Sequence, residues 1–426
     1  MEGCDMADFS VKPLETLCTA GFFAYLHGFS AVDSWLGRET GAAVQVLTNA
    51  DAADLARLFA DLRYPGMDIA DAALDDTKKV CYFHCADMRE FAFEENSPSF
   101  NLLEFYQEYK SRAFYDPCGI YPLLTGIRRG IRKSAAAHSA KETHVKTDAN
   151  ADAFENVFEI LGGGLDPCSE RSRAVMDAAL ILAKYFPTDS VPNGGAGEQI
   201  KKIAELFGGL RKGPDPGQEE QRLLLCELMT SPNPGLGLDL LKACGFIGEL
   251  WPELAILEHT DHSKEFHPEG NAWTHTMETF HYRKTCDLRL SLGLLLHDTG
   301  KPVAVAAGSR RFNGHAELGE IEARRFLERL KFGASLTDDV CFLVRNHMLP
   351  AALPRLPLFR TEEVMSSHLF PVLLELYRCD ESSSFKGPDG YYESSAAYQS
   401  YLRNRRNPYR SADGKKLNRN GAAIVR

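Results

Sequence analysis

Residues 294–301 are Leu-Leu-Leu-His-Asp-Thr-Gly-Lys, an apolar run that ends in a histidine and an aspartate. The leucines favour a buried helix, and Thr299-Gly300 predicts that this helix stops just after Asp298. Two side chains that can bind a cation would then stand side by side at one helix end, which we expect to be exposed and rich in carbonyl groups. Imidazole and carboxylate together suit Zn, Mn, Fe, Ni or Mg.

Further histidines and an aspartate occur in helical or helix-end contexts on both sides of this run. His275 lies in a helix predicted over 273–286, and a tight turn would join that helix to an antiparallel one over 290–296. His275 would then face His297. Downstream follow His315, His347 and Asp380. Each residue alone has an ordinary explanation as a surface or helix-end polar side chain, but their order along the chain indicates a metal centre.

The bulk composition is that of a cytoplasmic globular protein. With 426 residues, the chain has room for about three domains at roughly 150 residues each. It contains no apolar run long enough to span a membrane, and the acidic N-terminus lacks the pattern of a secretory signal. The 11 cysteines are scattered and odd in number, which predicts reduced thiols.

The formal net charge of −11 argues against broad nonspecific binding of nucleic acid. Two local stretches, 126–146 and 403–426, are nevertheless basic. Such stretches can contact phosphates, or can simply be a solvated linker and a frayed terminus. The candidate RNA-binding side chains are Arg128, Arg129, Arg132, Lys133, Arg405 and Arg406.

The order of elements predicts an α+β protein with a small α/β head and a mostly helical body. Apolar runs indicate strands over 22–26, 43–47, 80–84 and 90–93, with a helix over 51–62. Amphipathic patterns indicate helices over 173–186, 221–229, 237–244, 318–330 and 337–346. We expect four parts: a head at 1–125, a helical neck at 126–230, a domain with the histidine–aspartate centre at 231–385, and a basic tail at 386–426.

His297-Asp298-Thr299-Gly300-Lys301 resembles the His-Asp-x-Gly-Lys signature of the HD superfamily of metal-dependent phosphohydrolases. The resemblance implies one divalent ion held by His275, His297, Asp298 and Asp380, and a second held with help from His315 and His347, with Asp298 bridging the two. Two such ions stabilise the attacking and leaving oxygens of a phosphate ester. It also implies catalytic roles for three residues: Asp298 orients the attacking water, His315 helps bind the second ion or the phosphate, and Lys301 neutralises developing charge.

A wider part of the chain resembles the bacterial tRNA nucleotidyltransferase/poly(A) polymerase family, in members with an appended HD domain. The matching stretches are Tyr-Leu-His-Gly at 25–28, Val-Leu-Thr-Asn-Ala at 46–50, Tyr-Asp-Pro-Cys-Gly at 115–119 and Trp-Pro-Glu-Leu at 251–254. The head would then be a degenerate nucleotidyltransferase domain. The family's paired magnesium aspartates fall on Ala43 and Gln45, and a glycine of its nucleotide loop falls on Phe29. Neither Ala43 nor Gln45 offers an anionic oxygen to a hard cation, and Phe29 is bulky where backbone N–H groups should reach a phosphate, so we expect nucleotidyl transfer to be lost.

Three functions follow from these patterns. The first is a metal-dependent phosphodiesterase or phosphatase acting on RNA 3′ ends, 2′,3′-cyclic phosphates or nucleotides, with one or two divalent ions. The second is an active tRNA CCA-adding or poly(A) nucleotidyltransferase. The third is a non-catalytic RNA-binding protein. The expected partners are a phosphate-ester substrate and tRNA or another RNA, with no membrane; the sequence leaves the oligomeric state open.

Overall fold

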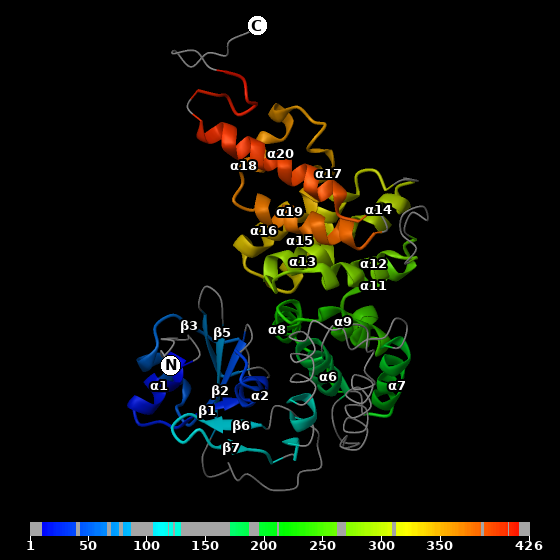
Figure 1. Cartoon of the computed structure of the whole chain (residues 1–426). Coiled ribbons are helices and arrows are strands. Elements are labelled where there is room, and N and C mark those ends of the chain that lie inside the picture. The colour runs from blue at the N-terminus through cyan, green and yellow to red at the C-terminus, as the bar shows by residue number, and fades with distance from the viewer. Residues whose placement is uncertain are drawn as a thin grey trace, which may run out of the picture. The chain divides into compact units, whose positions relative to one another are not determined.

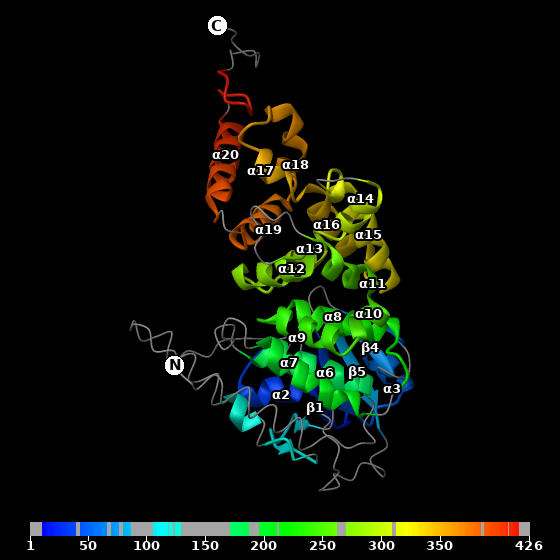
Figure 2. The same ribbon diagram turned by 90° about the vertical axis from the view of Figure 1, so that its right-hand side faces the viewer.

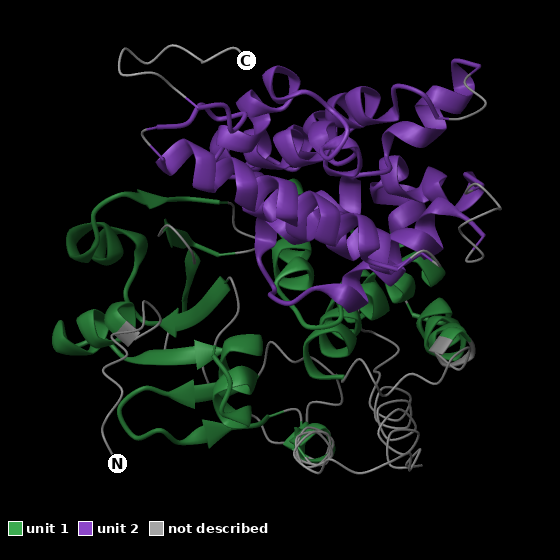
Figure 3. Ribbon diagram, turned by 45° about the horizontal axis from the view of Figure 1, so that its top comes forward, with its two compact units in different colours: residues 1–246 green, residues 247–426 purple. Residues whose placement is uncertain are grey.

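A computed structural model describes residues 11–39, 43–65, 70–75, 80–86, 105–117, 119–121, 124–128, 171–186, 196–210, 213–261, 270–308, 312–384, 387–407 and 409–416. The chain divides into two compact units, residues 1–246 and 247–426 (Figure 3). The first unit holds the sheet, and the second is helical (Figure 1). The mixed head and the helical body confirm the α+β class predicted from the sequence.

The described strands of the first unit form one seven-stranded sheet in the order β3-β4-β5-β2-β1-β6-β7. At its centre β2 and β5 run parallel, with Ala43 opposite Val80, and the other pairs are antiparallel. The strands are β1 (Ala24–His27), β2 (Ala43–Thr48), β3 (Leu62–Arg63), β4 (Ala72–Asp75), β5 (Val80–Cys85), β6 (Tyr106–Glu108) and β7 (Phe114–Tyr115). Three strand predictions are confirmed, and the fourth, over 90–93, lies outside the described residues.

The helices of this unit are α1 (Val11–Thr19), α2 (Phe29–Leu36), α3 (Ala52–Leu58), α6 (Arg171–Tyr185), α7 (Ala196–Gly208), α8 (Gln218–Met229) and α9 (Pro234–Ala243). The helix predicted over 51–62 is too long. Asp51 caps its start by accepting from the Asp54 amide, but Asp61 adopts a positive φ of 62°. Few residues other than glycine accept that conformation, so the chain turns there and enters β3.

A buried ion network ties the helices to the centre of the sheet. Lys184 Nζ in α6 lies 2.9 Å from Asp33 Oδ2 in α2 and 2.9 Å from Glu227 Oε2 in α8. Glu227 also accepts from the Ala43 amide at 2.7 Å, and the Tyr185 hydroxyl donates to Asp33 at 2.8 Å. Because the lysine is only 8% exposed, its positive charge is balanced by these two carboxylates rather than by water.

The second unit is built from helices joined by short connections and single turns (Figure 2). They are α11 (Pro252–Ala255), α12 (Ala272–Thr279), α13 (Leu288–Leu296), α14 (Gly300–Ala306), α15 (His315–Arg329), α16 (Ala334–Asn346), α17 (Leu349–Ala352), α18 (Glu362–Ser366), α19 (Phe370–Ser382) and α20 (Asp389–Arg406), with single turns η3 (Ile256–His259), η4 (Phe280–Tyr282) and η5 (Leu358–Arg360). The short helix α10 (Phe246–Leu250) falls at the boundary of the two units.

Local chemistry fixes the two helices that carry the first histidines. The Asn271 side chain accepts from the Thr274 amide at the start of α12, and Asp287 accepts from the Leu290 amide at the start of α13. The helix predicted over 273–286 ends earlier than expected, since α12 gives way to the 3₁₀ turn η4 after Thr279.

No helix among the described residues combines the length and apolar character needed to cross a bilayer.

Candidate metal centre

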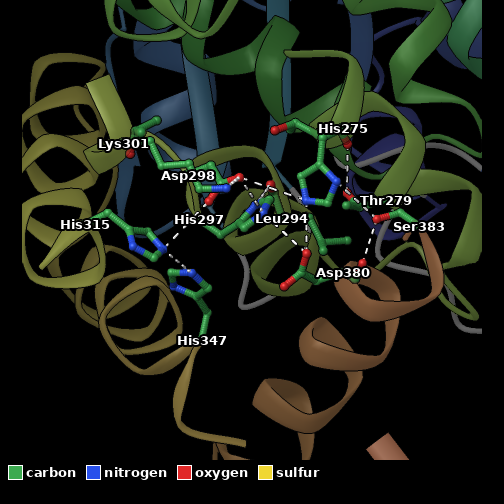
Figure 4. A network of polar contacts seen from close by, with 12 residues as sticks. His275, Thr279, Leu294, His297, Asp298, Lys301, His315, His347, Asp380 and Ser383 are labelled. Carbon is green, nitrogen blue, oxygen red and sulfur yellow. Dashed lines mark hydrogen bonds and ion pairs between the residues drawn. The ribbon is translucent and has the colours of Figure 1, made fainter. Parts of the chain in front are cut away.

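The second unit brings all six predicted ligands to one place (Figure 4). They come from five helices and a turn that are spread over more than a hundred residues of sequence. His275 lies in α12, His297 follows the last residue of α13, Asp298 is the next residue, His315 opens α15, His347 follows the last residue of α16, and Asp380 lies in the last turn of α19. Four of the six therefore stand at helix ends, where the chain can turn a side chain inward without breaking a helix.

The six side chains form two groups, each with ligand atoms within 4.8 Å of one another. One group is His275, His297 and Asp380, and the other is Asp298, His315 and His347. Asp298 lies between them: Oδ2 is 3.3 Å from His297 Nε2, and Oδ1 is 3.9 Å from His315 Nε2. A single carboxylate therefore faces both groups with different oxygens, the arrangement that a bridging ligand requires.

The main chain fixes the tautomers of three of the histidines. The Nδ1 atoms of His297, His315 and His347 each lie 2.7–2.8 Å from the carbonyl oxygen of the residue three positions earlier. A carbonyl only accepts, so each Nδ1 carries the hydrogen and each Nε2 presents a lone pair toward the centre. The buried Nε2 of His297 has no hydrogen-bond partner among the described residues.

His275 is held in the same way by a side chain that the sequence did not single out. Ser383 Oγ donates to the Asp380 carbonyl at 2.6 Å and lies 3.3 Å from His275 Nδ1. The hydroxyl hydrogen is thus engaged, and its oxygen is left to accept from Nδ1–H. His275 Nε2 then faces Asp380 Oδ1 at 3.0 Å. Such outer partners orient histidine ligands in metal sites generally.

The electrostatics of the centre suit a cation. Burial, reinforced by the neighbouring His297 and His315, lowers the pKa of His347 to about 3, so its ring is neutral. Burial also lowers the pKa of His315. Burial would raise the pKa of Asp380, but His275 and His297 outweigh it and hold that pKa well below its ordinary value. Neutral imidazoles beside ionised carboxylates are the donor set that Zn, Mn, Fe, Ni or Mg accepts.

One expectation about this centre is wrong: Asp298 is not at an exposed helix end but is 1% exposed. The expected contact of Lys301 with a phosphate stays a prediction. In the structure, Lys301 Nζ lies 2.6 Å from Asp298 Oδ2, and the residue is buried. In this conformation Lys301 holds the Asp298 carboxylate in position. Solvent reaches the centre mainly at Asp380, whose side chain is 21% exposed, and at His315, at 12%.

The glycine of the His-Asp-Thr-Gly-Lys run has a packing role. A Cβ on Gly300 would lie 2.0 Å from the His315 carbonyl oxygen and 2.4 Å from the Gly319 amide nitrogen. Since real contacts are never that short, only glycine lets the start of α14 approach the first turn of α15. This approach sets the position of His315 relative to Asp298.

The candidate RNA-binding residues are only partly described. Arg129, Arg132 and Lys133 lie outside the described residues. The Arg128 guanidinium stacks over the Trp35 ring at 5.0 Å. Arg405 and Arg406 are exposed in the last turn of α20, where Arg405 donates to the Tyr401 hydroxyl at 3.2 Å.

The head offers no comparable centre among the described residues, where the two groups of the second unit are the candidate metal sites. Ala43 is buried in β2, and Gln45 Oε1 lies 2.6 Å from His84 Nε2. The centre of the Phe29 ring lies 5.4 Å from the Lys184 ammonium nitrogen. The degenerate positions are therefore occupied by packed or hydrogen-bonded neutral side chains.

Comparisons with known proteins agree with these features. Residues 273–369 match the family model for the HD domain, a segment that holds five of the six ligands and ends before Asp380. The CC-adding tRNA nucleotidyltransferase of Thermus thermophilus is 36% identical over 141 residues, 31% of this chain and 32% of that protein. A multifunctional CCA protein of Halorhodospira halophila is 34% identical over 122 residues, 28% of this chain and 29% of that protein. The matches thus span about a third of each relative's length.

Among solved structures, the Bacillus stearothermophilus CCA-adding enzyme in complex with CTP covers 93% of this chain, and 82% of that structure is covered in return. Its sequence identity is 15% and its TM-score is 0.44. The family resemblance therefore rests on the match to the HD-domain family and on the similarity to the sequence relatives, and not on this structural likeness. Together they confirm the resemblance found in the sequence: residues 273–369 match the HD domain, and about a third of the chain is similar to tRNA nucleotidyltransferases.

Proposed function

We propose that the protein is a phosphohydrolase of the HD type, which cleaves a phosphate ester at the centre formed by His275, His297, Asp298, His315, His347 and Asp380. The observation that carries the proposal is the position of Asp298 between two groups of ligand atoms. Divalent ions held by such groups polarise a phosphate and supply a nucleophile from water near neutral pH.

The side chains around the centre have distinct roles in this proposal. Three of the four histidines, His297, His315 and His347, present fixed Nε2 lone pairs because main-chain carbonyls accept their Nδ1 hydrogens. Lys301 orients the Asp298 carboxylate through its 2.6 Å contact. Asp298 would in turn accept a hydrogen bond from the attacking water and so aim the water oxygen at the phosphorus.

A substrate would approach from the side of His315. A cavity of about 460 Å³ opens there, lined in part by Asn313, His315, Arg345 and Asn346. Arg345 is 54% exposed and forms an ion pair with Glu320 at 2.5 Å. A guanidinium and two amides beside the more accessible histidine suit the phosphate and the polar groups of a nucleotide or RNA end.

The test is hydrolysis of bis(p-nitrophenyl) phosphate and of 2′,3′-cyclic AMP by the full chain after removal of metal and addition of Mn²⁺, Ni²⁺ or Mg²⁺. We expect metal-dependent hydrolysis that His297→Ala with Asp298→Ala abolishes. His281, which is half exposed in η4, gives the matched control His281→Ala, with activity unchanged. Hydrolysis that survives the double substitution would sink the proposal.

A second candidate is CCA or CC addition to tRNA, the activity for which the sequence relatives are named. This activity would need other metal ligands, because Ala43 and Gln45 stand where the family has its metal-binding aspartates. Incorporation of labelled CTP or ATP into tRNA decides between the two, and we expect none above a control without protein.

A partner RNA is part of the first proposal rather than a separate function. The exposed arginines at the end of α20 offer contacts to phosphates. Such binding releases counterions from the RNA, so it weakens as the salt concentration rises. Deleting residues 403–426 is expected to lower tRNA affinity and its salt dependence while leaving hydrolysis of small esters intact. Unchanged affinity would remove this stretch from the proposal.

A further inference from the structure

The first unit contains a cavity that the proposed hydrolase chemistry does not use. Its volume is about 250 Å³. Polar side chains from the sheet and from α6 and α8 share its wall with apolar ones. The wall includes His27, Phe29, Ser30, Gln45, His84, Arg173, Met176, Asp177, Leu180, Glu220, Leu223 and Glu227.

Asp177 is unusual in this wall because its carboxyl group is buried within an apolar helical run. It lies on α6 within the run Ala174-Val175-Met176-Asp177-Ala178-Ala179, is 8% exposed and faces the cavity. No described residue forms a hydrogen bond or an ion pair with its carboxyl group. A buried carboxyl without a partner costs several kcal/mol in the charged state. Folding alone does not explain an aspartate at this position.

Most of the other ionisable groups around the cavity are already matched. Arg173 pairs with Glu220 at 3.3 Å, and Glu227 shares the Lys184 ammonium with Asp33. The His84 ring is neutral, because burial lowers its pKa to about 4. The wall therefore carries more acid than base. A triphosphate would be repelled from it, whereas a cation would be attracted.

We propose that this cavity binds a small organic cation of the amidine or protonated-amine class with an apolar body, and that Asp177 is its anchor. An amidinium presents two N–H donors to the two carboxylate oxygens, the geometry of the strongest charge-assisted hydrogen bonds. The ring or chain of the ligand packs against Met176, Leu180 and Leu223. Gln45 in β2 and Ser30 in α2 offer further acceptors.

The proposal is independent of the metal centre, and its test uses the full chain. Isothermal titration calorimetry with benzamidine is compared with benzamide, which has the same shape but no charge. We expect benzamidine to bind more tightly than benzamide. Asp177→Asn, which keeps the side-chain shape, should weaken benzamidine binding at least tenfold. Leu223→Phe should weaken it by narrowing the cavity without altering any charge.

Three controls separate this site from others. Glu205→Gln removes an exposed acid of the same unit, and His347→Ala alters the metal centre, so both should leave benzamidine binding unchanged. Triphosphate with Mg²⁺ should not compete with benzamidine. The proposal fails if benzamidine does not bind, if Asp177→Asn binds it as the unaltered protein does, or if triphosphate with Mg²⁺ displaces it.

Discussion

His315 and His347 point their Nε2 atoms at each other across 3.0 Å. Each ring donates its Nδ1 hydrogen to the main chain, so two lone pairs meet, and this contact is repulsive unless a cation or a proton lies between them. Burial and the neighbouring rings lower the pKa of His347 to about 3, which makes a shared proton unfavourable. A divalent ion is the remaining way to satisfy both nitrogens.

We therefore expect the two groups of ligands to load separately. His347→Ala should remove the ion of the His315 group and lower Mn²⁺ uptake from two per chain to one, while His275→Ala should remove the ion of the other group. Asp298→Ala, which touches both groups, should weaken both. The measurement is equilibrium dialysis with metal analysis, and His281→Ala serves as the unaffected control. Loss of all bound Mn²⁺ in either the His347 or the His275 variant would point to one shared ion instead.

Bound metal should also stabilise the second unit. A ligand that binds only the folded state raises the free energy of unfolding by about 2.7 kcal/mol at a hundred times its Kd. Mn²⁺ is expected to raise the melting temperature of the unaltered protein and to have little effect on Asp298→Ala. Differential scanning calorimetry with and without chelator provides the comparison.

Gly300→Ala tests the packing that positions His315. The new Cβ would meet the His315 carbonyl at 2.0 Å and the Gly319 backbone at 2.4 Å, so α14 and α15 must move apart. Overpacking of this kind costs about 1–3 kcal/mol or more. We expect a lower denaturation midpoint and weaker Mn²⁺ binding. Gly248→Ala is the matched control, since a Cβ there meets nothing within 4 Å. A Gly300→Ala variant with native metal affinity would contradict this role.

The sequence predicted the centre better than it predicted its surroundings. His297-Asp298 could be placed because an apolar helix that ends in two ligand-type residues has few other uses, and the order of the remaining histidines extended the set. Ser383 could not be found, because a serine at a helix end gives no signal until α19 and α12 are known to be adjacent. The burial of Asp298 was missed for the same reason: it depends on packing between helices that are distant in sequence.

In the head, too, local structure could be predicted from the sequence, whereas contacts between distant segments could not. Alternating and apolar runs predicted three of its strands, since their residues pack locally on a sheet. Nothing local predicts that Lys184 is the counterion of Asp33 and Glu227, because the three residues come from separate helices. Asp177 did leave a signal, a lone carboxylate inside an apolar helical run, and its meaning emerged only from the cavity that it lines.

Lys184→Met tests whether this internal cation holds the first unit together. The substitution leaves Asp33 and Glu227 buried without a positive partner, and breaking a buried ion pair in this way costs about 3–5 kcal/mol. We expect a marked fall in the denaturation midpoint followed by tryptophan fluorescence. Lys201→Met, at an exposed position on α7, should leave the midpoint almost unchanged. A stable Lys184→Met protein would show that the acids are neutral or solvated.

Asp177 makes the stability of the folded protein fall as the pH rises. Burial raises its pKa from 3.8 to about 7, against a smaller opposing effect of Arg173. The folded state therefore holds the proton more tightly than the unfolded state, so the stabilising contribution is complete below pH 3.8 and is lost as the pH rises toward 7. The loss is about 1.4 kcal/mol for each pH unit in that window. His84 acts in the opposite direction, because its pKa is lowered to about 4 and its contribution is lost as the pH falls.

Comparing the stability of Asp177→Asn with that of the unaltered protein separates the effect of Asp177 from that of His84. Asp177→Asn cannot ionise and keeps His84, so it should be more stable than the unaltered protein at pH 8, by a few kcal/mol, and should match it near pH 4. Urea unfolding at several pH values measures the difference. The same substitution is expected to weaken the binding of benzamidine, so stability and binding would move in opposite directions at one residue. A variant that is less stable at pH 8 would mean that the carboxylate has a partner in the folded protein, and both the titration and the anchoring role would then be wrong.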